Sequence, residues 1–199
     1  ALTRKEIRNN LNIPQEAILV CSSGTMDWRK GIDLIPQIAS KALSSNSIDV
    51  YFMWIGGEHT GIDFEKIVYD LEKLKLTEKV KLISSIKNSV DYFVASDIFL
   101  LCSREEPVGM VALEAASLSI PIICFENAGG MPEFVESDCG IVVPYLNIER
   151  TAEAILHLSK NSTQRLKMGG NAAIKVKQFD INNTCIKITN TINQLIKLS

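Results

Sequence analysis

The sequence predicts a Rossmann-like α/β domain, a doubly wound parallel sheet of about six strands with helices on both faces. Short apolar runs recur along the chain without the polar alternation of a half-exposed sheet, which is typical of strands covered on both faces. Segments with helical spacing separate these runs, as right-handed crossovers between parallel strands require. The expected strands are residues 17–21, 50–55, 80–83, 98–102, 121–125 and 140–143.

The connecting segments carry apolar residues on one side at spacings of three and four, as amphipathic helices do. We expect helices over 32–43, 64–74 and 111–118, and a short lead-in helix over 3–11. From residue 148 onward the pattern predicts three helices and no strand. In the last of them, 181–198, the apolar residues form a continuous stripe made of Ile181, Cys185, Ile188, Ile192 and Leu195.

Composition excludes several classes of protein. The chain has 199 residues, of which 46% are hydrophobic and 22% charged, so we expect one globular domain spanning residues 1–199. A net charge of −2 gives no basic surface for a nucleic-acid partner. The longest apolar run, 50–55, is far shorter than the roughly 20 residues that span a bilayer. No transmembrane or signal segment is apparent, which predicts a cytoplasmic location.

Cysteine and histidine usage gives no sign of a metal site. The five cysteines form no C-x-x-C pair, and four of them lie inside apolar runs, where a free thiol is a small buried hydrophobe. The two histidines have no ligand-like spacing. We therefore expect neither zinc nor redox chemistry.

Function is expected in the loops after the strands, because doubly wound sheets bind ligands beyond the carboxyl ends of their strands. The first such loop, 22–31, contains Gly24 and ends in Arg29-Lys30-Gly31. Glycine between a strand and a helix exposes backbone amides to an anion, and Lys30 would place an ammonium beside a phosphate. Taken alone, the Arg29-Lys30 pair is more often a solvated turn.

The second loop carries two glutamates separated by seven residues, Glu106 before the expected helix and Glu114 within it. The helix would begin near Gly109, so the amides of residues 109–111 would face an anion. An ionised Glu114 can accept two hydroxyl donors at once, and a ribose presents such a pair. The alternative is that Glu114 caps or pairs on the helix surface, although its neighbours are apolar.

A third loop, 126–133, places Gly129 and Gly130 before Pro132 at a helix start, which suits an anion, a sugar or a plain turn. Other chemistries lack their motifs. The sequence contains no P-loop, no G-x-G-x-x-G fingerprint, no D-x-D metal pair and no G-x-S-x-G elbow. With no general base in view, the domain is interpreted as a binder of an activated donor.

The three loops in this order resemble those of the carboxyl-terminal, donor-binding domain of group 1 (family 4) retaining glycosyltransferases, which have the GT-B fold. The resemblance covers roughly residues 18–179, and the E-x7-E spacing is its most specific part. The segments that carry it are Gly24 with Arg29-Lys30-Gly31, Glu106-Pro107-Val108-Gly109-Met110-Val111-Ala112-Leu113-Glu114-Ala115, Gly129-Gly130-Met131-Pro132-Glu133, Asp138-Cys139-Gly140-Ile141-Val142-Val143 and Arg165-Leu166-Lys167-Met168-Gly169.

The resemblance implies a role for each matching residue. Lys30 would hold the donor diphosphate and Glu106 would contact the transferred sugar, which makes these two the catalytic candidates. Glu114 would hold the ribose hydroxyls. The nucleotide-sugar is a substrate, and neither a cofactor nor a divalent metal is implied. The further donor-binding candidates are Gly24, Thr25, Arg29, Ile86 beside the nucleobase, and the amides of Gly109, Met110 and Val111.

The sequence departs from the family pattern at three positions. Thr25 stands where the family usually has arginine, so either diphosphate binding would depend on Lys30 and Arg29, or the anion would be held more weakly. Ser84 stands where the family often has glycine in the loop near the base, and Val108 replaces a frequent phenylalanine.

The resemblance also implies a larger protein. GT-B enzymes have an amino-terminal domain that binds the acceptor, here expected to be a glycan or lipid, and this chain matches only the second domain. We expect the chain alone to be inactive, and the full enzyme to lie at the inner membrane face as a peripheral protein. The stripe of the last helix is expected to be partly exposed and to mediate dimerisation. Two alternatives stay open: a non-catalytic nucleotide-sugar-binding or scaffolding module, and a GT-B epimerase or phosphorylase.

Overall fold

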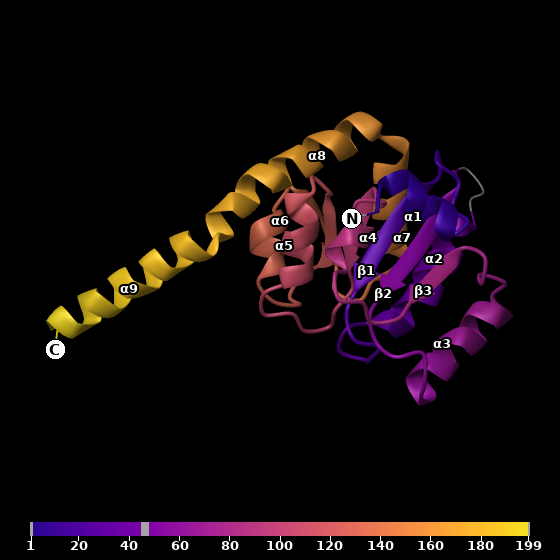
Figure 1. Cartoon of the computed structure of the whole chain (residues 1–199), viewed down its shortest axis with the longest axis horizontal. Coiled ribbons are helices and arrows are strands. Elements are labelled where there is room, and N and C mark those ends of the chain that lie inside the picture. The colour runs from indigo at the N-terminus through magenta and orange to yellow at the C-terminus, as the bar shows by residue number, and fades with distance from the viewer. Residues whose placement is uncertain (1, 45–47, 199) are drawn as a thin grey trace.

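The computed structural model describes residues 2–44 and 48–198, which form a six-stranded parallel sheet with helices on both faces (Figure 1). The strands lie in the order β3-β2-β1-β4-β5-β6. This confirms the predicted doubly wound fold. The strands are β1 (Ile18–Ser23), β2 (Val50–Ile55), β3 (Val80–Ile83), β4 (Ile98–Leu101), β5 (Ile122–Phe125) and β6 (Gly140–Val143).

The order of strands reverses at the centre of the sheet. β1 pairs with β2 on one side and with β4 on the other, so β2 and β3 extend the sheet in one direction and β4, β5 and β6 extend it in the other. The loops that follow β1 and β4 therefore leave the same edge of the sheet side by side. In doubly wound folds this switch point is where ligands bind.

Helices cover both faces of the sheet. α2 (Ile35–Leu43), α3 (Ile62–Lys73) and α7 (Ile148–Lys160) pack on one face. The opposite face is covered by α1 (Arg4–Asn10), α4 (Val90–Phe93), α5 (Met110–Ser117), α6 (Met131–Val135) and α8 (Ser162–Lys175). Two 3₁₀ turns, Ile32–Leu34 and Val176–Phe179, precede α2 and follow α8.

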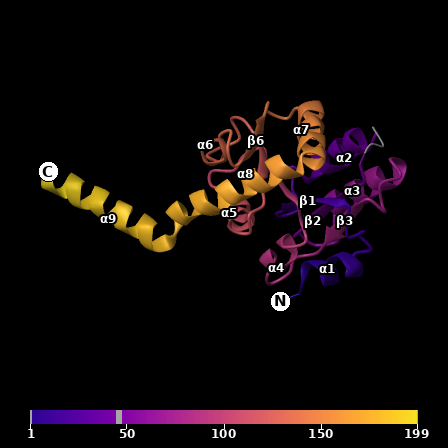
Figure 2. The ribbon, with the colours of Figure 1, turned by 90° about the horizontal axis from the view of Figure 1, so that it is seen from above.

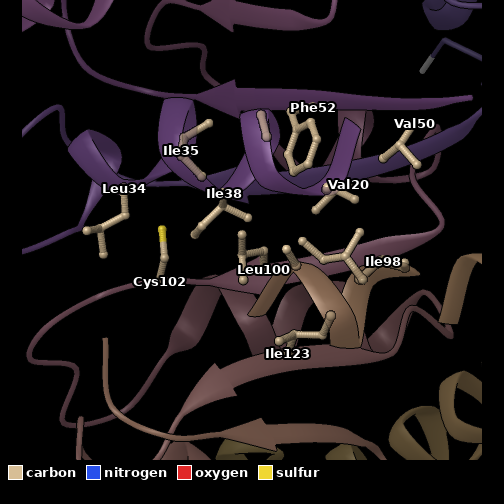
Figure 3. Packing of buried hydrophobic residues seen from close by; sticks show 14 of the residues in the cluster. Val20, Leu34, Ile35, Ile38, Val50, Phe52, Ile98, Leu100, Cys102 and Ile123 are labelled. Atoms are coloured by element: carbon tan, nitrogen blue, oxygen red, sulfur yellow. The ribbon is translucent and has the colours of Figure 1, made fainter. Parts of the chain in front are cut away.

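Successive strand residues enter different cores. Val20 and Leu100 face the α2 side, where Figure 3 shows them opposite Ile35 and Ile38. Their neighbours Leu19 and Leu101 belong to the core on the other face. Because both faces of the sheet are covered, most strand positions are apolar, which is the pattern that the sequence shows; Ser22 and Ser23 in β1 and Lys81 in β3 are exceptions.

The boundaries differ from the predicted ones in a few places. β1 continues to Ser23, two residues beyond the predicted end, because its pairing with β2 extends to the Ser23–Ile55 register. The helix expected over 32–43 begins as a 3₁₀ turn, and Pro36 lies in the first turn of α2. The short helix α4 was not predicted, since four residues are too few for a periodic signal.

The last helix, α9 (Ile181–Leu198), extends away from the sheet and the other helices (Figures 1 and 2). Ile188, Ile192 and Leu195 are at least half exposed, and Cys185 is exposed. The predicted stripe is therefore exposed along the described part of the helix, whereas the side chain of Ile181 lies outside the described residues. Dimerisation through it stays a prediction. In the described part of the chain, no helix combines the length and apolarity that crossing a membrane requires.

A buried charge cluster holds α1 against the amino-terminal edge of the sheet. Arg8 is fully buried and donates to the carbonyls of Ala95 and Ala17 at 2.9 and 2.7 Å and to the Asp97 carboxylate at 2.7 Å. Asp97 also accepts from Arg4 at 2.7 Å and from the Leu19 amide at 2.9 Å. One carboxylate thus compensates a guanidinium that has no access to water.

We predict that Asp97→Ala lowers the free energy of unfolding by about 3–5 kcal/mol, because it leaves a buried guanidinium without its counter-charge. Urea unfolding followed by circular dichroism measures this change. Asp49→Ala is the matched control, since Asp49 also precedes a strand but forms an exposed ion pair with Lys79. Such pairs contribute about 0–1 kcal/mol, and equal losses in the two variants would contradict the prediction.

Candidate functional site

The loop after β1 packs directly against the loop after β4. The Arg104 amide donates to the Arg29 carbonyl at 2.8 Å, and the Cys102 thiol to the Gly31 carbonyl at 3.4 Å. Gly31 has a φ of 77°, and a Cβ there would lie 2.0 Å from the Cys102 carbonyl oxygen. Only glycine permits this approach, which brings Lys30 to the start of the second loop.

The two catalytic candidates contact each other. The Lys30 ammonium forms an ion pair with the Glu106 carboxylate. The side chain of Lys30 is 16% exposed and that of Glu106 is 10% exposed. The same carboxylate oxygen accepts from the Ser103 hydroxyl at 3.3 Å. A Cβ on Gly24 would lie 3.1 Å from the Lys30 side chain, so the lysine stem passes closely over that glycine. Sequence reasoning placed these residues in one site, and the structure brings Gly24, Lys30 and Glu106 together.

The third loop fixes Glu106 from the other side. The Glu106 amide donates to the Ala128 carbonyl at 2.6 Å, and the Gly130 amide donates to the Pro107 carbonyl at 3.3 Å. Gly129 has a φ of 138°, and a Cβ there would lie 2.0 Å from the Glu106 carbonyl oxygen. The paired glycines therefore hold the glutamate loop in place by close backbone contact.

The amino terminus of α5 lies close to Glu106 in the chain. Gly109 is its N-cap, and no side chain caps the helix. The Met110 amide donates to the Val108 carbonyl at 2.9 Å, and the amides of Ala112 and Leu113 donate to the Gly109 carbonyl. Among the described residues of this turn, the backbone N–H groups of Gly109 and Val111 are therefore the ones that could donate to a bound anion. Met110 was expected to offer its amide as well, and here that amide is engaged.

Glu114 lies one turn further along α5 and is half-buried. None of the ion pairs among the described residues involves it, and its side chain does not cap the helix. Burial raises the pKa of the Glu114 carboxyl. The structure therefore does not support the alternative of a surface pair, and it holds a partly desolvated acceptor where the resemblance implies a ribose contact.

The remaining candidates do not join the Lys30–Glu106 pair by any hydrogen bond or ion pair between described residues. The Thr25 hydroxyl donates to the Asp27 carboxylate, which also accepts the Lys30 amide at 2.9 Å. Arg29 is exposed and donates to the Glu105 carbonyl at 3.2 Å. Ile86 is half-buried and packs against the core on the α5 side. The loop that carries it is joined to the loop after β2, because the Ser85 amide donates to the Gly57 carbonyl at 2.9 Å.

Sequence reasoning missed the groups that hold the two loops together. Arg104 forms a two-point ion pair with Asp33 at 2.7 and 2.8 Å, and the Tyr145 hydroxyl donates to the Arg104 carbonyl at 3.2 Å. Asp33 lies 71 positions before its partner. No local pattern connects residues so far apart, so the sequence carried no signal for this pair.

Four cysteines are buried, as expected, and Cys185 is exposed. Burial raises the pKa of the thiols of Cys21, Cys102 and Cys124 to about 12, which leaves them protonated and poorly nucleophilic. In the described part of the chain, no group of three His, Cys, Asp or Glu side chains is arranged to hold a metal.

Fold and site together define a doubly wound α/β domain whose candidate site lies at the carboxyl end of its sheet. The family of group 1 glycosyl transferases matches residues 3–175, and the chain belongs to this family. The family resemblance of the three loops is thereby confirmed.

Relatives and solved structures agree with this assignment. The chain is 31% identical over 129 residues to the O-antigen biosynthesis glycosyltransferase WclY of Escherichia coli, a match that covers 65% of this chain and 33% of that protein. It is 26% identical over 192 residues to the poly(glycerol-phosphate) alpha-glucosyltransferase of Bacillus subtilis, covering 94% of this chain and 28% of that one. The chain thus spans about a third of these relatives.

Among solved structures, a glycosyltransferase from Rickettsia africae superimposes with a TM-score of 0.85 at 20% identity, covering 98% of this chain and 52% of that one. HepE from Anabaena, solved in complex with UDP-glucose, gives 0.83 at 21% identity, with coverages of 96% and 52%. The likeness shows that this chain has the fold of one half of a GT-B protein.

We predict that Glu114→Gln stabilises the fold at pH 7, because it removes a carboxylate whose charged form is disfavoured by burial. A carboxyl with a raised folded-state pKa binds its proton first in the folded state, so the wild type recovers stability as the pH falls through that pKa. The advantage of the variant should therefore shrink between pH 7 and pH 4.5. Urea unfolding at both pH values tests this, and a difference independent of pH would contradict it.

Proposed function

We propose that this chain is the donor-binding domain of a retaining glycosyltransferase and holds a nucleoside-diphosphate sugar at the carboxyl edge of its sheet. The observation that carries the proposal is the Lys30–Glu106 pair, two largely buried opposite charges that the switch point of the sheet brings together. The pair adjoins an uncapped helix terminus whose amides are directed outward from α5.

The pair suits the two ends of a glycosyl donor. A diphosphate would take the place of the carboxylate beside the Lys30 ammonium, and sugar hydroxyls would donate to the freed Glu106 carboxylate. In the loaded state Lys30 would keep a counter-charge and Glu106 would keep hydrogen-bond donors, so donor binding leaves neither side chain without a polar partner. The amides of Gly109 and Val111 would add hydrogen bonds to the diphosphate or sugar.

Lys30 would also support the chemical step. Departure of the nucleoside diphosphate places negative charge on the leaving phosphate, and an ammonium already held in position stabilises that charge without reorganisation. The proposal needs no divalent metal, because the lysine and the helix amides supply the positive potential. It places no covalent intermediate on this chain.

Uracil is the first base to test, and the acceptor is a glycan or lipid. HepE has been solved with UDP-glucose and Staphylococcus aureus TarM with UDP, and this chain shares their fold. Its relatives act in O-antigen and capsular polysaccharide biosynthesis or on phosphatidylinositol, as their names state. On this proposal the acceptor binds a separate amino-terminal domain, the isolated chain is inactive in transfer, and the full enzyme works as a peripheral protein at the inner membrane face.

Calorimetric titration of the chain with UDP, GDP and ADP tests the proposal. We expect one of the three to bind with a Kd from micromolar to low millimolar, equally well in EDTA and in magnesium. Lys30→Ala should weaken that binding about 10- to 100-fold, because a charge-assisted hydrogen bond contributes roughly 1.5–3 kcal/mol.

Arg29→Ala is the matched control for Lys30→Ala, since it removes the neighbouring cation from the exposed side of the same loop. It should change the Kd less than twofold. A greater loss in Arg29→Ala than in Lys30→Ala would assign the diphosphate to Arg29. Binding of none of the three nucleotides would contradict the proposed function.

Glu114→Ala should weaken binding of UDP about tenfold and binding of 2′-deoxy-UDP less, because the deoxynucleotide offers this carboxylate one ribose hydroxyl fewer to lose. Titration of both nucleotides into both proteins gives the four affinities. Equal losses for the two nucleotides would reject the ribose contact.

A further inference from the structure

Arg104 bonds to residues on both sides of Lys30. Its Nη1 donates to the Trp28 carbonyl at 2.5 Å and to the Asp33 carboxylate at 2.8 Å, and its Nη2 reaches the same carboxylate at 2.7 Å. Its amide donates to the Arg29 carbonyl at 2.8 Å. Trp28 and Arg29 precede Lys30, and Asp33 follows it, so every one of these bonds ends within three residues of the lysine.

The guanidinium is occupied and shielded from solvent. The side chain of Arg104 is 8% exposed, and the hydrogen bond to Asp33 raises the pKa of the guanidinium, which stays charged. Its positive face lies 4.7 Å from the centre of the Trp28 ring, in cation–π contact. Trp28 itself is 64% exposed, so the ring covers the guanidinium from the solvent side. With its charge committed to Asp33, Arg104 is not a phosphate ligand.

The backbone of Arg104 is held as firmly as its side chain. Tyr145, from the loop after β6, donates to its carbonyl at 3.2 Å. Arg104 also lies only two positions before Glu106, and Arg29 donates back to the intervening Glu105 carbonyl at 3.2 Å. The residue thus joins the segment of Lys30 to the segment of Glu106 from within the interface of the two loops.

We propose that Arg104 is a positioning residue for the donor diphosphate, which sets the place of the Lys30 ammonium through its bonds to Trp28, Arg29 and Asp33. The inference rests on the proposed function and adds to it a residue that touches no part of the donor. Lysine cannot replace it, since a single ammonium cannot bond the carboxylate at two points and the Trp28 carbonyl together.

The test compares UDP with UMP in the wild-type chain and in Arg104→Lys. Because Arg104 acts through Lys30, and Lys30 acts on the diphosphate, the variant should lose about tenfold in UDP affinity and less than twofold in UMP affinity. If wild type prefers another base, its diphosphate and monophosphate replace this pair. General loosening of the fold would weaken both nucleotides alike, and that result would overturn the proposal.

A second readout needs no nucleotide. The chain has two tryptophans, and Trp54 is buried, so acrylamide quenching of fluorescence reports mainly on Trp28. Arg104→Lys should make quenching more efficient, because the ring loses the guanidinium stacked on it. Unchanged quenching would overturn the proposal, since the loop would then hold its place without Arg104.

Arg4→Lys is the matched control. Arg4 also joins backbone carbonyls to an aspartate, Asp97, but at the opposite edge of the sheet. It should leave UDP affinity, UMP affinity and quenching unchanged. Failure of wild type to bind any nucleotide would overturn the proposed function and the positioning role with it. Wild-type UDP affinity in Arg104→Lys would overturn the positioning role alone.

Discussion

The contact between the loop after β1 and the loop after β4 is the constraint on which the site depends. The strand order makes β1 and β4 neighbours, and Gly31 lets the first loop lie so close to the second that the Cys102 thiol donates to the Gly31 carbonyl. Lys30 reaches Glu106 only because of this approach. Any side chain at position 31 would separate the loops, and the cation of the site would part from its carboxylate.

Buried charge is handled differently at the two edges of the sheet. At the amino-terminal edge, the Arg8 guanidinium donates to backbone carbonyls and to the Asp97 carboxylate. These acceptors satisfy its hydrogen bonds and leave no room for a ligand. At the carboxyl edge, Lys30 meets Glu106 in a pair that retains some exposure. The first arrangement stabilises the fold, whereas the second leaves charge that a ligand can take over. This division follows from the geometry of parallel sheets, whose ligands bind at the carboxyl edge.

Glu114 and α9 are two features that lower the stability of the isolated fold. A half-buried carboxylate without an ion partner among the described residues is unfavourable, and so is a helix whose isoleucines face water. Groups that weaken a fold in isolation are expected where binding occurs, because the ligand or partner supplies the missing interaction. Glu114 lies on α5, the helix that begins just after Glu106, so this unfavourable burial of a carboxylate lies next to the candidate site.

The sequence by itself determined the sheet, most of the helices and the loops that carry the candidate site residues. Strands buried on both faces produce unbroken apolar runs, and amphipathic helices produce a three- and four-residue spacing, so both can be read locally. The glycines and Glu106 could be placed on loops, and Glu114 on a helix, for the same reason. Only the tertiary structure decided how these loops meet. It paired Lys30 with Glu106, tied Thr25 to Asp27 and joined Arg104 to Asp33. The two long-range pairs join residues more than 70 positions apart, and their meeting depends on the order of strands in the sheet, which no local pattern encodes.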